Sequence, residues 1–73
     1  MDQRYTVSTL YGKNLDKIES VFFFDNPAGC ELQLKYLLKR KVPAVAKNPK
    51  GEIIGRVIED EISPGGFTMW FEN

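Results

Sequence analysis

Apolar side chains in the middle of the chain recur with the spacing of an amphipathic helix. At 100° per residue, one sector of this helix holds Cys30, Leu34, Leu37 and Leu38. Asn26 can cap the start, and Pro27 suits the first turn because no N–H is needed there. Basic residues favour the far end, and Pro43 disfavours helical geometry in the residue before it. The pattern therefore predicts a single helix over residues 26–41.

Five other segments have the character of β-strands, namely residues 5–11, 21–24, 42–47, 52–58 and 67–71. Residues 5–11 alternate as expected of a strand with one exposed face. Residues 21–24 are apolar throughout, which favours a central strand, or one that meets the helix on one face and a partner on the other. Proline and glycine predict a type I turn at 48–51 and a type II turn at 63–66. Gly55 indicates a bulge or a close approach of the backbone.

The order of these elements is strand, strand, helix, strand, strand, strand. It predicts an α+β fold, a ββαβββ sandwich in which one helix packs on a mixed or antiparallel sheet. A β-grasp topology is one arrangement that fits this order, but the order alone does not determine which strands pair. We expect residues 1–73 to form one compact domain with a small core, because a chain this short buries only about 60% of its surface on folding.

The composition removes the usual catalytic groups. The 73 residues include no histidine and one cysteine, so the commonest general base, a Cys/His zinc site and an internal disulfide are all excluded. We therefore expect no enzyme activity, no cofactor and no bound metal. No apolar run approaches the roughly 20 residues that span a bilayer, and the N-terminus has no signal-like apolar stretch. We expect a soluble, cytoplasmic protein without membrane contacts.

Two weaker chemical candidates have simpler explanations. Cys30 lies in the first helical turn, where a thiol pKa is lowered and a nucleophile is conceivable. It shares its sector with the leucines, however, and we expect a small buried thiol. The acids at 59–61 lack the spacing of a calcium loop, and we expect a solvated corner there.

The formal net charge of zero conceals a segregated arrangement. Residues 1–31 carry three bases and five acids, residues 32–51 six bases and no acid, and residues 52–73 one base and five acids. The first candidate site is the side of the helix opposite its leucines, with its continuation along the chain: Leu32, Lys35, Tyr36, Lys39, Arg40, Lys41, Lys47 and Lys50. Such a group fits phosphates and a stacked base, an acidic protein surface with Leu32 and Tyr36 as anchors, or simply a solvated face.

The second candidate site comes from the surplus of aromatic side chains. The chain has nine rings, whereas one helix covers only one face of a sheet. We expect some of Tyr5, Tyr11, Phe23 and Trp70 on the open face, where they would form a platform for a partner. The alternative is a minor cluster beneath loops.

These observations favour a function in binding. We expect a small non-enzymatic regulator that binds a larger protein complex stoichiometrically and modulates or inhibits it. A phage-type inhibitor of a host machine such as RNA polymerase has this size and this lack of motifs, but the comparison is by analogy. The alternative is a nucleic-acid-binding module that uses the basic segment 35–50. A homo-oligomer is a further option, because an uncovered aromatic face can meet its own copy.

Overall fold

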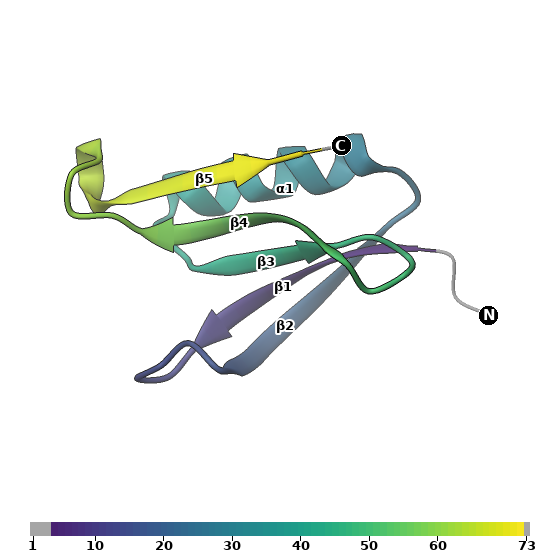
Figure 1. The fold of residues 1–73 in the computed structure, drawn as a ribbon, viewed down its shortest axis with the longest axis horizontal. Coiled ribbons are helices and arrows are strands. Elements are labelled where there is room, and N and C mark those ends of the chain that lie inside the picture. Colours follow the sequence, from purple (N-terminus) through teal and green to yellow (C-terminus); the bar gives the residue numbers. More distant parts are fainter. Residues whose placement is uncertain (1–3, 73) are drawn as a thin grey trace.

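The computed structural model describes residues 4–72. Its strands are β1 (Tyr5–Tyr11), β2 (Lys17–Phe24), β3 (Ala44–Lys47), β4 (Ile53–Glu59) and β5 (Phe67–Phe71). The helix α1 (Pro27–Lys39) joins β2 to β3, and a short 3-10 turn, η1 (Pro64–Gly66), precedes β5. The predicted α+β fold, with one helix on a five-stranded sheet, is confirmed (Figure 1).

The sheet has the order β2-β1-β3-β4-β5, and every neighbouring pair is antiparallel. Of the arrangements that the element order allowed, the antiparallel sheet is therefore the one observed. The β-grasp pairing, in which the first strand lies beside the last, is not observed, because β1 lies between β2 and β3. The turn end of the β1–β2 hairpin projects away from the rest of the molecule in Figure 1.

The helix begins as predicted and ends two residues early. The Gly29 N–H donates to the Asn26 side chain at 3.0 Å, so Asn26 is the N-cap and Pro27 the first helical residue. At the other end, the Lys41 N–H donates to the Leu38 carbonyl and the Val42 N–H to the Leu37 carbonyl. This is a Schellman motif, and it requires a left-handed backbone at Lys41, whose φ is 58°. The change of backbone hand ends α1 before Lys41.

Local hydrogen bonds also define the turns. The Gly51 N–H donates to the Asn48 carbonyl, which closes the predicted turn between β3 and β4. The Gly66 N–H donates to the Ser63 carbonyl, with Gly65 at φ 78° and ψ −1°, as a type II turn requires. The strand limits are less well predicted. In particular, β2 begins at Lys17 instead of residue 21, so it includes a polar half.

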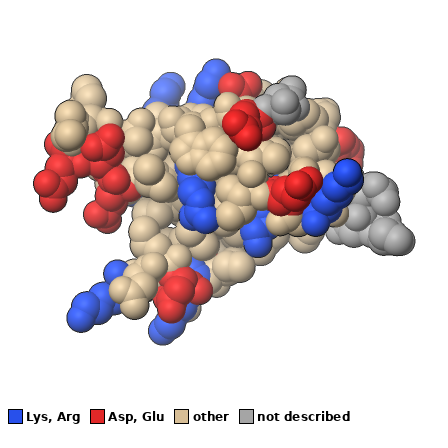
Figure 2. Space-filling view, in the orientation of Figure 1, with Lys and Arg blue, Asp and Glu red and all other residues tan. Residues whose placement is uncertain are grey.

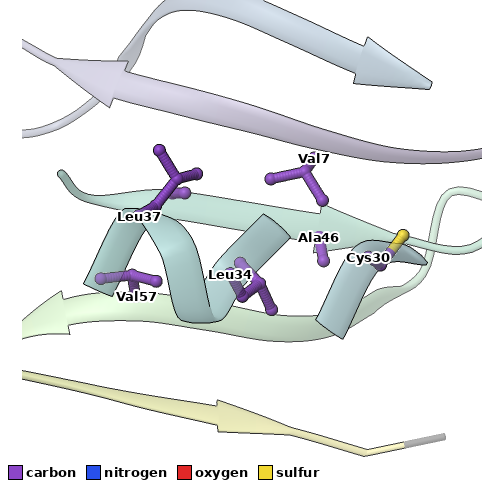
Figure 3. Close-up of a cluster of buried hydrophobic side chains, with 7 residues drawn as sticks. Val7, Cys30, Leu34, Leu37, Ala46 and Val57 are labelled. Carbon is purple, nitrogen blue, oxygen red and sulfur yellow. The ribbon is translucent and has the colours of Figure 1, made fainter. Parts of the chain in front are cut away.

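The core lies between α1 and the three middle strands of the sheet. Its buried apolar residues are Val7, Cys30, Leu34, Leu37, Ala44, Ala46 and Val57, most of which are labelled in Figure 3. The strand residues in this set are small, which brings the helix close to the sheet. At Gly55 an added Cβ would lie 2.8 Å from Cδ1 of Leu34 and 2.8 Å from Cδ1 of Phe71. The close backbone approach predicted at Gly55 is therefore confirmed.

Candidate functional site

The side of the sheet that faces away from α1, called the open face below, carries several exposed apolar side chains of the strands, among them Phe23 and Trp70. Side chains alternate along a strand, so residues between the core positions belong to this face. One row crosses all five strands through the paired positions Val21, Ser8, Val45, Arg56 and Trp70. The next positions along the strands add Thr6, Phe23, Lys47, Ile53, Ile58 and Thr68.

Exposure on the open face rises from its middle to its borders. Ser8 and Val45 are nearly buried although no helix covers them, because side chains of the neighbouring strands flank them. Phe23 on β2 is 49% exposed, and Trp70 on β5 is 40% exposed. Their rings are therefore held on a rigid sheet at the two borders and remain accessible to a partner.

The charges at the cross-strand paired positions of the open face are positive, whereas Glu19 lies in the bulge of β2 and has no partner on β1. Arg56 is paired across the strands with Trp70, and Lys47 lies between Thr6 and Ile53. Just before β1, the Arg4 guanidinium lies 4.4 Å from the ring centroid of Phe23, a cation–π geometry. Figure 2, which looks onto this face, shows basic side chains among the uncharged atoms of its middle.

Acidic side chains lie around the open face. They gather at the β4–η1 connection, which carries Glu59, Asp60 and Glu61 and lies at the left of Figure 2. At the opposite end of β4, Glu52 and Glu72 line an open cavity of about 370 Å³ together with Asn48, Ile53 and Ile54. A basic and apolar centre is therefore bordered by acids at two ends.

The structure divides the first candidate site, the basic segment. Leu32 and Tyr36 are 68% and 53% exposed on the outer side of α1, accompanied by exposed Lys35, Lys39, Arg40 and Lys41. The Arg40 guanidinium lies 5.6 Å from the Tyr36 ring centroid. Lys47, in contrast, belongs to the open face on the other side of the sheet, and Lys50 lies in the β3–β4 turn. The eight residues do not form one continuous surface.

The second candidate site, the aromatic platform, is partly as expected. Some of Tyr5, Tyr11, Phe23 and Trp70 were expected on the open face, and Phe23 and Trp70 lie there, whereas Tyr5 does not. Tyr5 shares a face of β1 with buried Val7 and packs against the core beneath the helix. Tyr11 lies at the hairpin end of β1, half exposed and 6.0 Å from the Lys17 ammonium.

Sequence reasoning missed the partners of these rings on the open face. Arg56 was a recognisable signal, because Ile58 shares its face of the strand and alternation places both away from Val57. Val21 and Ile53 were less accessible to prediction, since their face depends on pairing with β1 and β3. Only the strand order shows that these residues form one surface.

The two weaker chemical candidates behave as structural groups. Cys30 is fully buried in the core, and burial raises the pKa of its thiol, so the expectation of a small buried thiol is confirmed. Within residues 4–72, no cluster of three or more histidine, cysteine, aspartate or glutamate side chains is placed to hold a metal ion. In the same range, no helix has the length and apolar character needed to cross a membrane.

No protein-family model matches this chain, and no curated protein or solved structure is similar enough to it to count as a match.

Proposed function

We propose that this chain is a small non-enzymatic regulator that binds a larger protein complex stoichiometrically, and that its open face is the docking surface. The observation that supports the proposal is the row from Val21 to Trp70, in which Arg56 lies beside an exposed Trp70. Tryptophan and arginine are the residue types most enriched in the energetically dominant parts of protein interfaces. A solvent-facing side of an antiparallel sheet normally carries polar residues, so its apolar character indicates a partner.

The charges indicate what kind of protein surface would fit. Lys47 and Arg56 carry the charges at the cross-strand paired positions of the open face, and both are basic. A partner surface that combines apolar side chains with carboxylates would complement them. Binding of this kind modulates a larger complex by covering part of it. A cytoplasmic location belongs to the same proposal, because a lone buried cysteine suits a reducing compartment.

Nucleic acid is the second candidate for the same surface. Phe23 and Trp70 could stack bases, and the neighbouring cations could contact phosphates. Three observations favour protein instead. The basic segment 35–50 is divided between opposite sides of the sheet, the open face carries aliphatic Val21, Ile53 and Ile58, and Glu52 and Glu72 lie where they would repel a polyanion.

Affinity capture with matched surface variants tests the proposal. The wild-type chain, Trp70→Ala, Arg56→Glu and the helix variant Tyr36→Ala are immobilised at equal density after circular dichroism has confirmed their folds. Nuclease-treated lysate is passed over each, and retained proteins are quantified by mass spectrometry. We expect a complex that is retained by wild type and Tyr36→Ala and reduced at least tenfold by both open-face substitutions.

Two outcomes would contradict the proposal. One is retention that survives Trp70→Ala and Arg56→Glu but is lost with Tyr36→Ala, which would move the docking surface to α1. The other is retention that disappears on nuclease treatment and returns when a single-stranded oligonucleotide is added, which would support the nucleic-acid alternative.

A further inference from the structure

Within residues 4–72, β2 is the more exposed of the two edge strands of the sheet. Six of the eight residues of β2 are exposed, and none is buried. Ile18, Val21, Phe22 and Phe23 are between 39% and 57% exposed, so apolar side chains are accessible on both faces of this strand. At the other edge, β5 carries one exposed residue, Trp70, and its Phe67, Met69 and Phe71 pack against the core beneath α1.

An edge strand presents N–H and C=O groups to any strand that can align with it, and charges, prolines or bulges normally prevent such pairing. In β2, such charges and the bulge lie only at the hairpin end of the strand. Lys17 and Glu19 supply charge there, and Glu19 has no partner on β1 because the register shifts beside it. Residues 21–24 have neither charge nor proline. The apolar half of the edge is therefore open to another strand.

The charges at the two ends of β2 favour a second copy as the occupant. Suppose that two β2 strands pair antiparallel with Val21 of one copy opposite Val21 of the other. Phe22 of each copy then lies opposite Ser20 of the other, and Lys17 of each copy lies opposite Asp25 of the other. The flexible Lys17 side chain spans the offset that the bulge at Glu19 introduces. Centring the pair on Phe22 would instead place Glu19 against Asp25, and like charges in directly opposite positions are destabilising.

A dimer through the two open faces is less favourable. That arrangement would bring the cations Lys47 and Arg56 of one copy onto a face whose cross-strand paired positions carry the same cations and no acid. The open face is thus complementary to an acidic partner, whereas the β2 edge is complementary to itself.

We propose that two copies of this chain pair antiparallel through β2 and form one continuous sheet. The two-fold axis of such a pair runs perpendicular to the sheet, because antiparallel neighbours in one sheet keep the same faces on the same sides. Both α1 helices therefore lie on one side, and the two open faces join on the other. The dimer presents two docking surfaces side by side, which favours a partner with two copies of the same epitope.

Sedimentation equilibrium of the purified chain, without any partner, tests this pairing. The wild type is expected at twice its mass of 8.4 kDa over a wide range of concentrations. Val21→Lys, which places two ammonium groups at the two-fold axis, is expected to be monomeric. Lys17→Asp and Asp25→Lys are each expected to weaken dimerisation about fivefold, because each creates two like-charge contacts. The double variant Lys17→Asp/Asp25→Lys restores opposite charges and is expected to return to the wild-type dimerisation constant.

Trp70→Ala is the matched control, since it alters the open face and leaves the β2 edge intact. It is expected to remain dimeric while losing the captured complex, so a failure of the docking proposal and a failure of the pairing proposal are distinguishable. Should Val21→Lys fail to fold, the charge-swap series still decides the question. A monomeric wild type, a dimer abolished by Trp70→Ala, or a double charge swap that restores nothing would each overturn the pairing.

Discussion

The two faces of the sheet differ in where their large apolar side chains lie and in how exposed those side chains are. Beneath α1 the fully buried strand positions are small: Val7, Ala44, Ala46 and Val57 are at most 1% exposed, and Gly55 has no side chain at all. The larger side chains on this face, such as Phe67 and Phe71, are partly buried and pack around that centre. On the open face the large apolar side chains are partly in water, and Phe23, Ile53, Ile58 and Trp70 are 38–49% exposed. Small residues are needed where a helix must approach the backbone closely, as at Gly55, where an added Cβ would lie only 2.8 Å from Leu34 Cδ1.

Nothing in the sheet itself requires large apolar residues on the open face. A face that only meets water is more stable and more soluble with polar side chains. The contrast therefore separates residues that hold the fold together from residues that we propose for binding. Substitutions on the two faces are expected to affect different measurements, and the following three predictions test that separation, beginning with the largest effect.

Leu34→Ala is expected to lower the free energy of unfolding by about 3 kcal/mol, because Leu34 is fully buried between the helix and the sheet and its removal leaves a cavity. Trp70→Ala removes a larger side chain but is expected to cost only about 1 kcal/mol, since its ring is partly in water already. Urea denaturation followed by circular dichroism measures both. Equal losses would show that the two faces contribute alike to stability, contrary to the comparison.

Gly55→Ala is expected to destabilise the fold by about 2 kcal/mol through overpacking. The new Cβ would be 2.8 Å from Leu34 Cδ1 and from Phe71 Cδ1, and 3.0 Å from the Trp70 carbonyl oxygen. The double variant Leu34→Ala/Gly55→Ala lacks one of these contacts. Its loss in free energy of unfolding should therefore be smaller than the sum of the losses in the two single variants. Strictly additive losses in the same denaturation assay would contradict the close approach of α1 to β4.

Lys41→Gly is expected to raise the free energy of unfolding by about 0.5–1 kcal/mol. Lys41 holds φ 58° in the Schellman motif, and glycine adopts this left-handed conformation without strain. The matched control is Lys35→Gly, an exposed position within α1, where glycine should cost about 1 kcal/mol. Neither change should affect dimerisation or capture. A loss of stability in Lys41→Gly would refute the assignment of strain to this residue.

The start of the helix, its buried side and the turns could be predicted from short stretches of sequence. The start of α1 depends on Asn26 and Pro27, which act within one turn, and the turn before β5 depends on Pro64 and Gly65. The buried side of the helix followed from the spacing of Cys30, Leu34 and Leu37 alone. In each case the interacting residues lie within a few positions of one another, so their pattern contains the information needed to predict them.

The candidate surface was only half predictable. The aromatic pattern predicted that some of Tyr5, Tyr11, Phe23 and Trp70 lie on an open face without showing which of them, and Arg56 was not among the candidates. Period-2 alternation shows which residues share a face of one strand, whereas the face that meets the helix depends on how the strands align with one another. The basic segment 35–50 was divided for the same reason, because neighbours in sequence separated onto α1, β3 and a turn.

By itself, the sequence determined the helix, its buried side, the turns and the α+β class, since each depends on contacts between residues close along the chain. The tertiary structure alone decided that β1 lies between β2 and β3, that Val21, Arg56 and Trp70 share one row, and that β2 is the more exposed of the two edge strands. Hydrogen bonds between strands join residues that are distant in the chain, and no local pattern specifies their register.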